Sequence, residues 1–197
     1  MQPQPQNQDT PAGWLFRNGP LLITLVIRSW AASVEVFLRR DFGSHYLGTQ
    51  AALVIPLCVF WASLWEGHDA RPLVIFLLCY LVFCVHARLG VWRRYLKGQH
   101  EHSHYNGWPR LMKLFPRSSE RTIKLYVEPG LVFGIAFLIG NHNPPLCFFL
   151  FIAGGATFAL NADIDTHERW RARQMNDAAI EQQLVAEQFR EVRGESW

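Results

Sequence analysis

The feature that most limits how this chain can fold is a set of long apolar windows without charge. These windows lie between compact blocks of charged residues. Residues 47–65, 72–87 and 129–162 contain no Asp, Glu, Lys or Arg. A charge at the centre of a membrane span costs roughly 2.5–3.5 kcal/mol on insertion scales, so a bilayer selects such segregation. Charged residues make up only 18% of the chain, against about 25% in soluble proteins. The pattern predicts an all-α integral membrane protein.

Four transmembrane helices arranged as two hairpins account for the apolar windows. The first hairpin covers residues 47–92 and the second covers residues 123–162. A span of 19 residues, such as the first, covers about 28 Å at 1.5 Å per residue, close to the thickness of a hydrocarbon core. The expected spans are Leu47–Trp65, Pro72–Trp92, Ile123–Gly140 and Leu146–Leu160.

The connection between the hairpins fixes the predicted topology. Arg88–Lys124 holds nine of the 19 Lys and Arg residues, whereas the short turns 66–71 and 141–145 hold one, Arg71. Because basic residues concentrate on the cytoplasmic side, we expect residues 93–122 and both termini to be cytoplasmic, in a bacterial inner membrane. The modest net charge of +3 favours anionic lipid headgroups as partners and argues against nucleic acid.

Aromatic and basic side chains near the span ends are expected to contact the membrane interface. Trp and Tyr prefer the headgroup level, and long basic side chains reach it from within a span. In residues 107–116, apolar and basic side chains interleave, as in a segment resting on headgroups; a loop packed beneath its own spans is the alternative. The expected interface residues are Trp61, Trp65, Arg88, Trp92, Trp108, Arg110, Lys113, Phe115, Lys124 and Tyr126.

The chain before the first hairpin divides into a polar tail and an ambiguous helix. Residues 1–13, rich in Pro and Gln, are expected to be disordered. For residues 20–40, the sequence predicts an amphipathic helix lying in the headgroup region, because one polar stripe runs along an otherwise apolar helix. A full span is the alternative, and it would have to hide Arg28 and Glu35 as an internal pair. The stripe consists of Thr24, Arg28, Ala32, Glu35 and Arg39.

The C-terminal residues 163–197 predict a long cytoplasmic helix that continues out of the fourth span, since no Pro or Gly interrupts residues 163–193. Apolar residues recur at three- and four-residue spacing, which favours a docking face. Three occupants remain open: the chain's own cytoplasmic segment, another subunit, or a second copy. The expected docking residues are Met175, Ala178, Val185, Phe189 and Val192.

The second hairpin contains small residues four positions apart, which allow two membrane helices to approach closely. These are Gly130 and Gly134 in the third span, and Gly155 and Ala159 in the fourth. The alternative is that membrane helices are simply rich in Gly and Ala. At the entrance of the third span, Lys124 and the acidic residue four positions later can form an ion pair.

A histidine cluster is the one constellation that resembles a chemical site. In an extended strand, His100, His102 and His104 would point to one side, and imidazole suits Zn, Cu, Ni or Fe. A solvated polar loop and a pH-responsive membrane contact are the alternatives. The sequence contains no nucleophile elbow, paired catalytic carboxylates or phosphate-binding loop. We therefore expect no enzymatic activity and no cofactor.

The expected working surfaces are cytoplasmic, because amphipathic sequence is concentrated on that side. The sequence favours a non-enzymatic scaffold or assembly subunit that docks a partner through its cytoplasmic surface, for example in an envelope secretion or transfer complex. Residues 163–193 are the expected contact for a protein partner or for self-association. The alternative is a small metal-handling or transport protein that works as an oligomer and uses the His100–His104 cluster.

Overall fold

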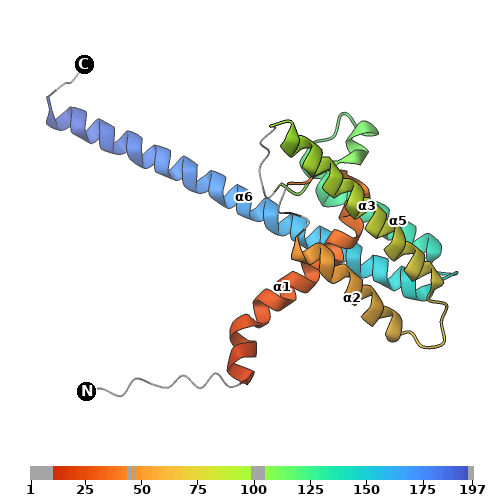
Figure 1. The fold of residues 1–197 in the computed structure, drawn as a ribbon. Coiled ribbons are helices and arrows are strands. Elements are labelled where there is room, and N and C mark those ends of the chain that lie inside the picture. The colour runs from red at the N-terminus through yellow and green to blue at the C-terminus, as the bar shows by residue number, and fades with distance from the viewer. Residues whose placement is uncertain (1–10, 44–45, 47, 99–104, 195–197) are drawn as a thin grey trace, which may run out of the picture. The chain divides into compact units, whose positions relative to one another are not determined.

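The computed structural model describes residues 11–43, 46, 48–98 and 105–194, and 80% of the chain is helical with almost no sheet (Figure 1). The prediction of an all-α protein is confirmed at this level. The chain divides into two units, of which the first ends at Leu160. The elements are α1 (Pro11–Leu38), β1 (Arg39–Arg40), α2 (Thr49–Ser63), α3 (Arg71–Leu96), β2 (Trp108–Pro109), η1 (Arg110–Lys113), α4 (Glu120–Thr122), the π-helical η2 (Ile123–Val127), α5 (Glu128–Ile139) and α6 (Pro144–Val192).

Among the described residues, four helices are long and apolar enough to cross a membrane, as the sequence predicts for an integral membrane protein. These four helices are not the same as the four spans that the sequence predicts. The predicted span Leu47–Trp65 corresponds to α2, which has 15 residues and covers only about 22 Å. A segment before the predicted hairpins is long enough instead. The four candidates are Gly19–Leu38, Arg71–Leu96, Glu120–Ile139 and Pro144–Arg190.

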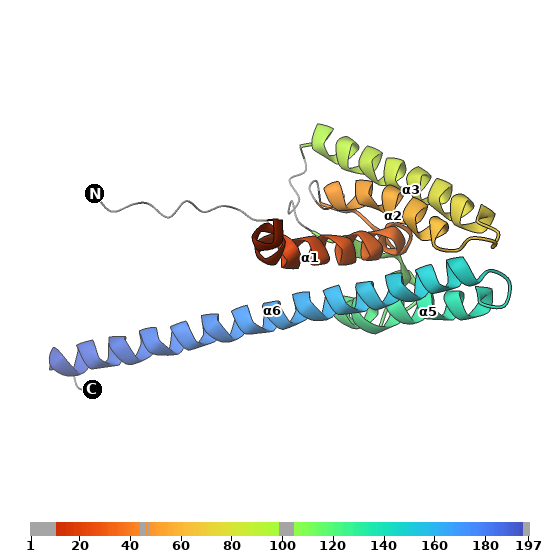
Figure 2. The ribbon, with the colours of Figure 1, turned by 90° about the horizontal axis from the view of Figure 1, so that it is seen from below.

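Helix α1 contributes to the helical core. In Figure 2 it lies between α2 and α3 on one side and the α5–α6 hairpin on the other. The Trp30 ring lies 5.7 Å from the Trp61 ring and 6.0 Å from the Phe149 ring. The Phe37 ring lies 4.9 Å from the Phe83 ring on α3. These contacts join both hairpins through the C-terminal half of α1.

The polar stripe predicted for an interfacial helix does not face outward along its whole length. Thr24 and Arg28 are exposed, but Ala32, Glu35 and Arg39 are buried. Glu35 and Arg39 can be buried because both have internal partners, which removes the need to reach water or headgroups. The structure therefore does not confirm the interfacial helix.

The predicted boundaries of the terminal segments also change. Pro11 begins α1, so residues 11–13 are helical where the sequence indicates disorder; Pro is well tolerated in a first helical turn. Residues 1–10 lie outside the described part of the chain. At the other end, α6 is one uninterrupted helix of 49 residues, which includes the long helix predicted from residue 163.

The two short turns are tied to each other. The side chain of Asn143 donates to the Asp69 carbonyl at 2.9 Å and accepts from the Leu146 amide at 3.0 Å. Nearby, the Trp61 Nε1 donates to the Pro145 carbonyl at 2.9 Å. These bonds hold the turn ends of both hairpins at the same end of the helical bundle.

A small antiparallel ladder joins distant segments at the other end of the hairpins. It pairs Arg39 with Pro109 and Arg40 with Trp108. Gly107 precedes the second strand with φ +88°, and a Cβ there would lie 2.9 Å from Phe42 Cε1. The close approach and the left-handed backbone both require glycine. The ladder brings the end of α1 beside the segment that follows α3.

Candidate functional site

A buried ion-pair cluster centred on Arg39 joins α1 to α5. The Arg39 Nη2 lies 2.7 Å from Glu128 Oε2, and its Nε donates to the same oxygen at 2.8 Å. Its Nη1 lies 3.0 Å from Glu35 Oε1. All three side chains are buried, with exposures of 0% to 1%. Charged side chains are almost never buried to this degree unless they are paired.

The surroundings keep Arg39 charged and hold Glu35 in place. Burial lowers the pKa of Arg39, but the Glu35 and Glu128 carboxylates outweigh burial and leave that pKa above its ordinary value. Tyr46 donates its hydroxyl to Glu35 Oε2. Burial raises the pKa of Tyr46 well above its ordinary value, so the phenol stays neutral and remains a donor.

A second layer of polar contacts extends the cluster to the segment before β2. The Arg39 Nη1 donates to the Asn106 carbonyl at 3.3 Å, and Lys124 Nζ donates to Asn106 Oδ1 at 2.7 Å. Lys124 also lies 2.7 Å from Glu120 Oε1, which accepts from the Tyr105 hydroxyl at 2.8 Å. Burial raises the pKa of Tyr105, so this donor also stays neutral.

The pairing differs from the local pairing that sequence spacing suggests. The structure pairs Lys124 with Glu120 and Glu128 with Arg39, whereas the four-residue spacing indicates Lys124 with Glu128. The π-helical η2 lies directly before Glu128, and π turns often occur at functional sites. The partner of Glu128 lies 89 residues earlier in the sequence, a separation that local spacing cannot reveal.

The cluster has one carboxylate more than it has guanidinium groups. Glu128 Oε1 is buried and has no hydrogen-bond partner among the described residues. Leaving a buried acceptor without a partner costs about 1–3 kcal/mol. The arrangement is suited to holding α1 against α5.

The predicted interface residues divide into exposed and internal groups. Trp61 is half-buried, and its indole nitrogen donates to a backbone carbonyl within the bundle. Lys124 has a side-chain exposure of only 12% and is bonded internally. Both side chains therefore have partners within the protein, and their contact with the membrane interface stays a prediction. Trp65 is half-buried, and the remaining residues are exposed: Arg88, Trp92, Trp108, Arg110, Lys113, Phe115 and Tyr126.

The predicted close helix contact does not use the predicted glycines. A Cβ added at Gly130, Gly134 or Gly155 would meet no atom within 4 Å, and Ala159 is exposed. At Gly154, by contrast, an added Cβ would lie 2.9 Å from the Phe133 ring. A bulky aromatic side chain, instead of a facing small residue, fills the space beside α6. The close contact seen in the structure therefore involves Gly154 and Phe133, and packing through the predicted residues stays a prediction.

The predicted metal site lies outside the described residues, since His100, His102 and His104 all fall in the segment 99–104. Within the described ranges, no group of three or more His, Cys, Asp or Glu side chains could hold a metal ion. The metal hypothesis for the histidine cluster stays a prediction.

The predicted docking face lies in the second unit. Met175, Ala178, Val185 and Phe189 are exposed, and the side chain of Val192 lies outside the described set. Phe189 is 71% exposed and Met175 is 69% exposed. An apolar row on a helix is therefore uncovered in the described structure.

Comparison of the chain with protein-family models, curated proteins and solved structures finds no match.

Proposed function

We propose that this chain is a non-enzymatic membrane scaffold or assembly subunit that docks a partner protein through residues 163–193. A subunit of an envelope secretion or transfer complex would work in this way. The exposed apolar row containing Met175, Val185 and Phe189 is the observation that supports the proposal most strongly. Uncovered apolar surface of this kind commonly marks a protein contact.

Charge favours a different protein over a second copy as the occupant of this face. Residues 161–197 contain eight acidic and five basic side chains, a net charge of −3. Two such tails side by side would repel each other, whereas a partner with an apolar groove and basic rim would be attracted. The polar positions Asn176, Gln183 and Glu187 fall on the opposite side of the helix at 3.6 residues per turn. The exposed Ile180 and Leu184 also lie toward that side and form a candidate second contact surface.

We propose a cytoplasmic C-terminus and a cytoplasmic Arg88–Lys124 segment in an inner membrane, on the strength of the basic-residue distribution. The direction of α1 bears on the other terminus. Trp30 contacts Trp61 near the turn end of the hairpins, and Arg39 contacts Glu128 at the opposite end. We also propose that α1 crosses the bilayer and that the 15-residue α2 crosses it where the bilayer is locally thinned. This gives five crossings and places the N-terminus on the non-cytoplasmic side instead of the expected cytoplasmic side.

The docking role is tested by photo-crosslinking in native membranes of the source cell. A photoreactive residue at Val185 or Phe189 is expected to capture the same single partner at both positions. In the matched control, the photoreactive residue replaces Glu187, which lies between Val185 and Phe189 in the sequence but on the other face of the helix. This control is expected to capture at most about a tenth as much of the partner. Equal capture from all three positions, or a homodimer as the only product, would rule out the proposed partner face.

A further inference from the structure

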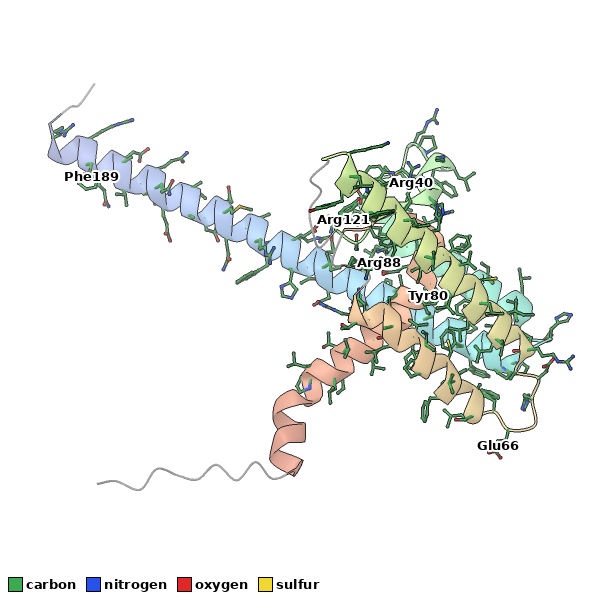
Figure 3. The ribbon with its side chains drawn as sticks, viewed as in Figure 1. Arg40, Glu66, Tyr80, Arg88, Arg121 and Phe189 are labelled. Atoms are coloured by element: carbon green, nitrogen blue, oxygen red, sulfur yellow. The ribbon has the colours of Figure 1, made fainter. Side chains whose placement is uncertain are left out.

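A basic groove of about 340 Å³ lies at the end of the helices opposite the short turns, and is lined by Arg40, Asp41, His86, Arg110 and Lys113. The lining residues come from three separate places. Arg40 and Asp41 lie in and directly after β1, His86 lies in α3, and Arg110 and Lys113 lie in η1. In Figure 3, Arg40 lies at the opposite end of the helices from Glu66. The groove therefore depends on the folded arrangement.

The charge balance of the groove is positive. Arg40, Arg110 and Lys113 supply three cations, and Asp41 is the one carboxylate among the lining residues. That carboxylate already has cationic partners, because it forms an ion pair with Arg94 and lies 3.5 Å from Arg40 Nε. Arg40 thus shares Asp41 with Arg94, and the lining side chains keep a formal excess of two positive charges from Arg40, Arg110 and Lys113 against Asp41.

Arg110 is held in a fixed position, while two other lining groups remain available. The Arg110 Nε donates to the Arg39 carbonyl at 3.0 Å, and its guanidinium lies 5.4 Å from the centre of the Phe83 ring. Among the described residues, Lys113 and His86 have neither a hydrogen bond nor an ion pair. A fixed guanidinium beside an available ammonium and an available imidazole suits a phosphate, whose oxygens accept several such hydrogen bonds.

Exposed apolar side chains lie next to this groove in the chain. Trp108 pairs through its backbone with Arg40 and is 37% exposed. Leu114 and Phe115 follow Lys113 directly and are also exposed. A soluble phosphate compound would gain nothing from this apolar surface, whereas the acyl chains of a lipid would cover it. The combination favours a lipid as the source of the phosphate.

We propose that the groove binds the phosphate of an anionic phospholipid, with Arg40, Arg110 and Lys113 supplying the positive charge and His86 a hydrogen-bond donor. The site is independent of the docking role of the tail. The proposal places one lipid at a defined position on this surface, in addition to the general contact with headgroups expected from the sequence.

The test measures lipid retention on the purified full-length protein by native mass spectrometry. Wild-type protein in detergent is titrated with phosphatidylglycerol and, separately, with phosphatidylcholine. The test variant carries Arg40→Gln and Lys113→Gln, and the control variant carries Arg71→Gln and Arg117→Gln, which removes two exposed cations elsewhere. Each lost groove cation is expected to weaken phosphatidylglycerol binding about five-fold, so about 25-fold together. The control is expected to bind like wild type.

Three results would overturn the proposal. They are equal affinity of wild type for the two lipids, equal losses in the test and control variants, and displacement of phosphatidylglycerol by an equimolar amount of inorganic phosphate. The last result would assign the groove to a soluble phosphate compound. Lys113→Glu alone, at an exposed position in η1, provides a second variant whose binding must also fall if the site is correct.

Discussion

Replacing Arg39 with Gln is expected to destabilise the folded protein by about 3–5 kcal/mol, the range found when one partner of a buried ion pair is removed. The substitution leaves Glu35 and Glu128 buried without their cation. Neither carboxylate can reach water without moving α1 away from α5. Unfolding of the purified protein in detergent, followed by circular dichroism during titration with a denaturing detergent, measures the loss.

The adjacent Arg40 provides a matched control, because it is also an arginine in β1 but its side chain is 47% exposed. Arg40→Gln is expected to change stability by less than about 0.5 kcal/mol. Adding Glu35→Gln and Glu128→Gln to the Arg39 variant is expected to recover most of the loss, since no uncompensated charge remains. Equal effects at Arg39 and Arg40 would show that the buried cluster does not hold α1 in place.

Gly107→Ala is the second substitution with a large expected effect, a loss of about 2–6 kcal/mol. Part of the loss is backbone strain, because φ is +88° and a left-handed residue other than Gly costs about 1–3 kcal/mol. The rest is overpacking, because the new Cβ would lie 2.9 Å from Phe42 Cε1 and 3.0 Å from the Arg40 carbonyl oxygen. Overpacking in a filled site costs about 1–3 kcal/mol.

Gly67→Ala separates these two contributions. Gly67 has nearly the same backbone angle, φ +86°, but an added Cβ would meet no atom within 4 Å. Its substitution should therefore carry the strain alone and destabilise the protein by about 1–3 kcal/mol. The same detergent unfolding experiment compares the two variants. If Gly67→Ala destabilises the protein as much as Gly107→Ala, the close approach of Gly107 to Phe42 has no energetic importance.

Helix formation could be predicted from the sequence because it depends on local pattern. The charge-free windows indicate apolar helices, and the absence of Pro and Gly from residues 163–193 indicates one continuous helix through the tail. Both features reappear in the structure as α3, α5 and α6. Local pattern does not determine which helices cover one another, and the errors occur there.

The segment 20–40 shows why. Glu35 and Arg39 are four residues apart on an apolar helix, a spacing that fits a solvated polar stripe and an internal ion pair equally well. What decides between them is Glu128, far away in the sequence, whose carboxylate meets Arg39. A Glu–Arg pair at this spacing on an otherwise apolar helix is nevertheless a signal for a buried cluster.

The contacts of Trp61 and of the glycines also depend on residues far away in the sequence. Tryptophan near a span end is typical of an interface anchor, but the indole of Trp61 donates to Pro145 in the other hairpin. The four-residue spacing of Gly130 and Gly134 permits close packing without requiring it, and Phe133 fills the space beside Gly154 instead. For the basic groove, the sequence singled out Arg110 and Lys113 but not Arg40 and His86, which only the fold brings beside them.

Topology labelling most directly tests the central claim that α1 crosses the membrane as part of the core and that the basic end is cytoplasmic. Single cysteines replace Asn18, His68, His142 or Tyr105, and a membrane-impermeant maleimide is applied to intact and disrupted cells, with wild-type protein controlling for its four native cysteines. Positions 18, 68 and 142 are expected to react in intact cells, and position 105 only after disruption. Position 18 reacting only after disruption, or position 105 reacting in intact cells, would contradict the claim.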